Sequence, residues 1–116
     1  MIKIIVETDK QTKKIVSLEV KGHASSDEEG KDLVCAAVSA VVIGGFNALI
    51  NPKDYSIVLQ KGLASIKTDC HLSEHDSIVL NTIMISLETI AEGNSDYVSL
   101  TKKEIYKKRW TVNYDV

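Results

Sequence analysis

Residues 32–50 read DLVCAAVSAVVIGGFNALI, a run in which nearly every position after the first is apolar or small. Asp32 stands where a helix N-cap belongs, so the run predicts a helix. Asn51 and Pro52 end it, because the residue before a proline avoids the helical conformation. A helix without a polar face is expected to be buried on most sides. This segment is therefore predicted to be the core helix of the domain.

Two strands are predicted on the N-terminal side of this helix. Residues 2–8 (IKIIVET) are β-branched and aliphatic, and residues 15–21 (IVSLEVK) alternate apolar with polar side chains. The polar stretch 9–14 between them indicates a turn, so the two strands form an antiparallel hairpin. Residues 25–31 (SSDEEGK) contain no apolar side chain and predict a solvated loop that leads into the helix.

A similar arrangement follows the helix. Residues 55–60 and 63–69 predict a second hairpin. Ser73 can cap a second helix that runs to about Glu92, and residues 97–101 predict a fifth strand. The predicted order is β-β-α-β-β-α-β. The fold class is therefore α+β, with two helices packed on a mostly antiparallel sheet.

The length of 116 residues fits one domain. We expect residues 1–101 to form it and residues 102–116 to be a basic and aromatic C-terminal extension. This extension can form an extra C-terminal strand with solvated lysines, or a surface that touches RNA or a ribosome. Charge runs are usually solvated faces, so direct RNA contact is not expected.

The composition indicates a globular protein without a membrane segment. Hydrophobic residues make up 44% and charged residues 26%, and the net charge of −2 requires no anionic partner. No apolar run reaches the roughly 18 residues of a membrane span, and MIKIIVETDK lacks the features of a secretory signal. We therefore expect a cytoplasmic protein, in which Cys35 and Cys70 are thiols.

Cys35 and His23 are the candidate catalytic residues. With Asp32 as the N-cap, Cys35 lies at the third helical position, where unpaired N–H groups and the helix dipole favour a thiolate. The loop that follows His23 is long enough to fold back and bring the imidazole beside the thiol. The imidazole could then accept the thiol proton and later protonate a leaving amine. A cysteine on an apolar helix is usually a small core residue, so spacing alone leaves both interpretations open.

The residues around this pair resemble a known family. The string GHA at residues 22–24, a short acidic loop, and DLVCAAVSA at residues 32–40 are similar to the ribosomal-processing cysteine proteases called Prp. In that family a GHA motif and a D-x-VCAAVSA motif are separated as they are here. The similarity extends through the core helix to Asn47, and more weakly to about Leu100. The family typically ends soon after the strand predicted at residues 97–101, whereas this chain continues.

The resemblance implies a function and a set of partners. Members of the family are cytoplasmic bacterial proteins that remove a short N-terminal extension from large-subunit ribosomal protein twenty-seven. They cut after an apolar sequence and before the basic mature terminus. By position, the nucleophile matches Cys35 and the base matches His23. The resemblance also implies a homodimer, and no cofactor is expected.

Five further residues are assigned supporting roles. Asp32 and Ser39 match recurring positions of the motif. Asp32 could orient the base or simply cap the helix, and Ser39 lies one helical turn after the nucleophile, on the same face. Asp27, Glu28 and Glu29 could form an acidic lid that attracts a basic substrate and closes on it.

Three alternatives to a protease remain open. Cys70, His71 and His75 have spacing that suggests zinc, but a fourth ligand is not evident, so no metal site is expected. Cys35 could instead be a redox-active thiol. The chain could also be a non-proteolytic, ribosome-associated binding module that uses its basic extension.

Overall fold

The computed structural model describes residues 1–22, 31–68 and 72–106, with residues 31 and 32 described by their backbone only. Strands and helices alternate nearly as the sequence predicts. The elements are β1 (Ile2–Asp9), β2 (Ile15–Lys21), α1 (Lys31–Asn47), a short 3-10 helix η1 (Pro52–Asp54), β3 (Ser56–Gln60), β4 (Leu63–Lys67), α2 (Glu74–Gly93) and β5 (Val98–Ile105).

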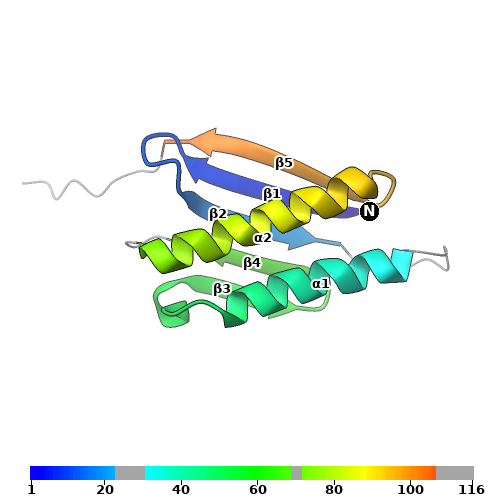
Figure 1. The fold of residues 1–116 in the computed structure, drawn as a ribbon, viewed down its shortest axis with the longest axis horizontal. Coiled ribbons are helices and arrows are strands. Elements are labelled where there is room, and N and C mark those ends of the chain that lie inside the picture. The colour runs from blue at the N-terminus through cyan, green and yellow to red at the C-terminus, as the bar shows by residue number, and fades with distance from the viewer. Residues whose placement is uncertain (23–30, 69–71, 107–116) are drawn as a thin grey trace, which may run out of the picture.

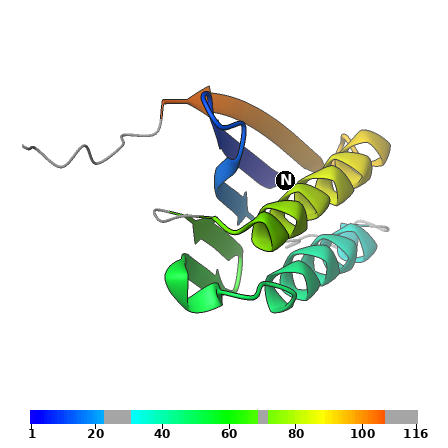
Figure 2. The ribbon, with the colours of Figure 1, turned by 60° about the vertical axis from the view of Figure 1, so that its left-hand side comes forward.

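The five strands form one sheet in the order β3-β4-β2-β1-β5. All neighbours are antiparallel except β1 and β5, which pair in parallel from Ile2 and Val98 to Asp9 and Ile105. Figures 1 and 2 show both helices on the same face of the sheet. The predicted fold class, two helices packed on a mostly antiparallel sheet, is confirmed.

The core lies between the sheet and the two helices. Alternate residues of the strands point into it, because successive side chains of a strand face opposite sides. Both helices contribute one stripe of apolar residues at helical spacing. The buried side chains that define this core are Ile2, Ile4, Val6, Leu18, Val20, Ile66, Val34, Val38, Val42, Phe46, Leu80, Ile83 and Leu87.

The start and end of α1 differ from the prediction. The helix already includes Lys31 and Asp32, so Asp32 lies inside the first turn and is not the N-cap. An acidic residue is also favourable in the first turn, next to the positive end of the helix dipole, so the sequence signal fits both positions. Cys35 is consequently the fifth residue of the helix rather than the third. The α-helix ends at Asn47, three residues before the predicted end.

The prediction that α1 is buried on most sides is wrong. Leu33 is 77% exposed and Ile43 is 47% exposed. Ala36, Ala37 and Ala40 are exposed as well. In a two-layer fold, the sheet and the neighbouring helix cover only part of each helix. An apolar helix surface therefore faces outward in the single chain.

The fifth strand continues to Ile105, four residues beyond the predicted end. The backbone N–H of Lys10 donates to the carbonyl oxygen of Ile105, at 2.8 Å, which joins this strand to the β1–β2 turn. Residues 107–116 lie outside the described part of the chain, so the extra C-terminal strand and the extension beginning at residue 102 stay predictions.

Candidate active site

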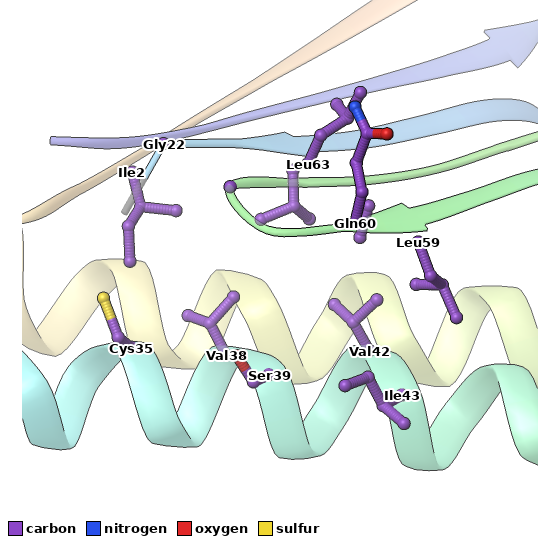
Figure 3. A pocket seen from close by; sticks show the side chains of 13 residues that line it. Ile2, Gly22, Cys35, Val38, Ser39, Val42, Ile43, Leu59, Gln60 and Leu63 are labelled. Atoms are coloured by element: carbon purple, nitrogen blue, oxygen red, sulfur yellow. The ribbon is translucent and has the colours of Figure 1, made fainter. Parts of the chain in front are cut away.

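A groove of about 520 Å³ lies between α1 and the β3–β4 hairpin. Cys35 lies at one end, and Ile43 and Leu59 lie at the other (Figure 3). Most of its lining is apolar, and it comprises Ile2, Val20, Gly22, Cys35, Val38, Ser39, Val42, Ile43, Leu59, Gln60, Gly62, Leu63 and Ala64. The groove therefore offers a thiol beside an apolar surface, which is the usual character of a site that binds an organic ligand.

Cys35 is a free, half-buried cysteine on the groove side of α1. Figure 3 shows its sulfur pointing toward Ile2, into the space between helix and sheet. Ser39 lies one turn further along α1 and lines the same groove. Cys35 is therefore not sealed in the core, and a ligand in the groove would contact its side chain.

Gly22, the residue directly before His23, lines the groove. Gly22 has a φ of 111°, and a Cβ at this position would lie 2.5 Å from the carbonyl oxygen of Met1. Only glycine adopts this conformation readily, so the sequence requirement here is steric. The N–H of Gly22 donates to the carbonyl oxygen of Gly62 at 2.9 Å, which ties the end of β2 to the β3–β4 turn.

The other predicted site residues fall outside the described part of the chain. These are His23, the lid residues Asp27, Glu28 and Glu29, and the side chain of Asp32. Gly22 and Cys35 line the same groove. His23 therefore follows a residue that already belongs to the site, as the Cys–His hypothesis requires.

The zinc hypothesis falls partly outside the described residues as well, because Cys70 and His71 are not among them. His75 is described, and its Nε2 lies 3.0 Å from the carbonyl oxygen of Ala48. No group of three potential metal ligands occurs within residues 1–22, 31–68 and 72–106. Within the same ranges, neither helix has the length and apolar character needed to cross a membrane.

Asp76 is a buried acid in the first turn of α2. Its carboxylate accepts hydrogen bonds from the N–H of Ile50, the N–H of Asn51 and the hydroxyl of Tyr55. Burial by itself raises the pKa of Asp76, but these three bonds and the nearby charge of His75 outweigh it and lower the pKa below 3.8. These partners precede Asp76 by 21 to 26 residues, so no local sequence pattern predicts them.

The length of the groove matches a short extended peptide. Eight residues separate Cys35 from Ile43 on α1, which is about 12 Å at 1.5 Å per residue. An extended peptide rises about 3.3 Å per residue, so three or four of its residues span the groove. A peptide bound here could present one carbonyl carbon to the thiol of Cys35.

Comparisons with known proteins agree with this geometry. The family described as cysteine protease Prp matches residues 1–99. The ribosomal processing cysteine protease Prp of Bacillus subtilis is 33% identical over 97 residues, covering 77% of this chain and 87% of that protein. The corresponding Staphylococcus aureus protein (strain Mu50) is 31% identical over 94 residues, covering 78% and 89%.

Solved structures give the same result. The S. aureus Prp protease in complex with a substrate peptide matches with a TM-score of 0.73 and 27% identity, covering 89% of this chain and 100% of that one. The same protease with a covalently linked product peptide matches with a TM-score of 0.75 and 29% identity over the same shares. The chain belongs to the Prp family of cysteine proteases.

Proposed function

We propose that this protein is a cysteine endopeptidase that removes the short N-terminal extension of large-subunit ribosomal protein twenty-seven during ribosome maturation. The observation that carries the proposal is the position of Cys35 at the end of an apolar, peptide-sized groove. The assignment of a ribosomal protein as substrate is supported by the relatives of this chain, which are named ribosomal processing cysteine proteases.

In the proposed mechanism, His23 accepts the proton of the Cys35 thiol and the thiolate attacks the carbonyl carbon of the scissile bond. The tetrahedral intermediate collapses to a thioester as the C–N bond breaks, and His23 donates its proton to the leaving amine. Water, deprotonated by His23, then hydrolyses the thioester and releases the extension. Backbone N–H groups at the start of α1 are candidate donors to the oxyanion.

The two sides of the proposed substrate have different chemistry, so we assign them to different parts of the site. We place the apolar residues before the cut in the groove, along Val38, Val42 and Leu63. The basic mature terminus leaves at the opposite end, near Gly22, because His23 follows that residue and must protonate the amine. Asp27, Glu28 and Glu29 come next in the chain and would attract this basic segment as a lid.

Asp32 and Ser39 complete the proposed site. Asp32 lies one turn before Cys35, where its carboxylate could orient the His23 imidazole. Ser39 lies one turn after it and lines the groove. Replacing either with alanine should reduce kcat/KM without abolishing cleavage.

The test is cleavage of a peptide that spans the extension junction, by the wild type and by Cys35→Ala. Cleavage by the wild type alone supports both the chemistry and the substrate. If neither protein cuts but Cys35 reacts rapidly with a thiol reagent near neutral pH, the substrate assignment is wrong. An inert Cys35 would contradict the enzyme itself.

Two further variants separate the protease from the other activities. His23→Ala should abolish proteolysis, whereas a redox-active thiol would keep its oxidation chemistry in that variant. Deletion of residues 103–116 should leave peptide cleavage mostly intact, whereas a ribosome-binding module would lose its binding.

We also propose that the protein acts in the cytoplasm as a homodimer. Apolar side chains exposed on the helices support the dimer: Leu33 is 77%, Ile78 59% and Ile85 58% exposed in the single chain. Exposed apolar surface of this kind is typical of protein interfaces. Sedimentation equilibrium should give twice the chain mass, and a monomer at all concentrations would contradict the dimer.

A further inference from the structure

The chain between α1 and β3 is held by one buried acid. Asp76, at the third position of α2, is fully buried, with an exposed fraction of 0%. Its Oδ1 accepts the N–H of Ile50 at 2.8 Å. Its Oδ2 accepts the N–H of Asn51 at 3.2 Å and the hydroxyl of Tyr55 at 2.5 Å. One carboxylate thus binds both halves of the segment that joins the two walls of the groove.

Neighbouring residues strengthen the same attachment. Ser73 caps α2 by accepting the N–H of Asp76 at 3.1 Å, which fixes the acid on the first turn. His75 Nε2 lies within hydrogen-bond distance of the carbonyl oxygen of Ala48, directly after the end of α1. The first turn of α2 therefore contacts the connecting segment at Ala48, Ile50, Asn51 and Tyr55.

This attachment lies close to one end of the groove. Ile43 is four residues before the end of α1, about 6 Å along the helix. Leu59 is four residues after Tyr55, about 13 Å along an extended chain. Cys35 is about 18 Å from the end of α1. A change at Asp76 therefore acts first on the end of the groove that is formed by Ile43 and Leu59.

We propose that Asp76 is a positioning residue that sets the spacing between Ile43 and Leu59, and so controls how the protease holds substrate residues far from the cut. This inference rests on the proposed function. Leu59 lies about 13 Å along the strand from Tyr55, so a rotation of the strand by about 5° at Tyr55 would move Leu59 by about 1 Å. Displacements of about 1 Å in a binding site can change rates by up to about a hundredfold.

The role assigned to Asp76 predicts a dependence on substrate length. A peptide with four residues before the cut reaches Ile43 and Leu59, whereas a peptide with one or two does not. Asp76→Asn should raise KM for the long peptide about tenfold, while KM for the short peptide stays within about twofold. The rate at which iodoacetamide alkylates Cys35 should also stay within about twofold, because that small reagent needs only the thiol end of the groove.

Two further variants separate positioning from general destabilisation. Tyr55→Phe removes one of the three bonds to the carboxylate and should raise KM for the long peptide about threefold, which keeps the test decisive if Asp76→Asn does not fold. Asn94→Ala removes the hydrogen bond that the Asn94 side-chain amide donates to the carbonyl oxygen of Ile90, at the opposite end of α2, and leaves the three bonds to Asp76 in place. It should destabilise the protein while leaving the ratio of the two KM values as in the wild type.

A loss that affects long and short peptides equally in Asp76→Asn and Tyr55→Phe would overturn the inference and leave Asp76 a structural residue. Binding of the long peptide to Cys35→Ala, measured by calorimetry with and without Asp76→Asn, does not depend on cleavage. If the wild type cuts no peptide, the proposed function fails, whereas an unchanged Kd in the double variant would contradict the role of Asp76 alone.

Discussion

Two regions between α1 and β3, the groove and the connecting segment that Asp76 binds, have opposite chemistry. At the groove end, Cys35, Ile43 and Leu59 are partly or largely exposed and surround an unfilled apolar volume. At the other end, Asp76 and Tyr55 are buried, and the carboxylate accepts three hydrogen bonds. The hydrogen-bonded region around Asp76 contributes stability, whereas the apolar surface of the groove is available to contact a ligand. Substitutions at the two ends should therefore change different quantities.

The largest effect is expected at the thiol. Cys35→Ala should lower kcat/KM for the junction peptide by at least about a thousandfold, because alanine has no thiol that can form the thioester. The free energy of unfolding should change by less than about 1 kcal/mol, since the substitution removes a single sulfur atom from a half-buried side chain. Residual cleavage near the wild-type rate would place the nucleophile elsewhere.

The close packing of α1 against α2 at Gly45 should affect the free energy of unfolding. A Cβ on Gly45 would clash with the Ile83 side chain of α2, whereas nothing lies within 4 Å of a Cβ on Gly44. Gly45→Ala should destabilise the fold by about 1–3 kcal/mol through overpacking. Gly44→Ala is the matched control and should be neutral or stabilising by up to about 1 kcal/mol, because alanine is the better helix former. Urea denaturation of both variants measures the difference, and equal stabilities would contradict the close packing of α1 on α2.

At the far end of the groove, the effect should appear in substrate binding. Leu59→Ala should raise KM for the long peptide about tenfold with little change in stability, because Leu59 is 51% exposed and lines the groove. Val58 is 40% exposed and precedes Leu59 on the strand, so its side chain faces the other side of the sheet. Val58→Ala should leave KM unchanged. An equal rise in KM for both variants would mean that the peptide does not bind along this wall.

The smallest expected effect is the pH dependence of the stability that the Asp76 carboxylate contributes. The pKa of Asp76 is lowered in the fold, so the unfolded chain binds the proton more tightly than the folded protein. The stabilisation by the carboxylate is therefore present above the ordinary pKa of 3.8 and is lost as the pH falls through the folded value. Tyr55 and His75 are the titratable groups beside it.

Urea denaturation from pH 7 to pH 3 measures this dependence. The wild type should exceed Asp76→Asn by about 1–3 kcal/mol at neutral pH. The difference should be constant above about pH 5 and should narrow at more acidic values. A difference that stays constant down to pH 3 would show that the charge of Asp76 does not contribute to stability.

Much of the fold follows from local patterns in the sequence. The alternation in residues 15–21 and the apolar run after Asp32 predict a strand and a helix that the structure contains. The sequence predicts that Ser73 caps the second helix, and its hydroxyl accepts the N–H of Asp76. Each of these signals depends on residues within one or two turns of each other, which is why the sequence alone reveals them.

Structure and sequence-based prediction differ where segments that are distant in the chain pack together. The apolar run predicts a buried α1, but burial depends on what packs against the helix, and Leu33 is 77% exposed. The contacts of Asp76 cannot be predicted from local patterns, because the hydroxyl of Tyr55 and the N–H of Ile50 come from more than 20 residues away. The candidate nucleophile could be named from the motif around Cys35, but the groove beside it could not.

The sequence by itself determined the strands and helices, the α+β class and the identity of the candidate Cys–His pair, because short-range patterning and a two-part motif carry that information. Tertiary structure alone decided that β1 and β5 pair in parallel, that Leu59 and Ile43 line the same groove, and that Asp76 binds the segment between α1 and β3. These features depend on the relative placement of elements far apart in the chain, and hydrophobic burial sets that placement without regard to sequence order.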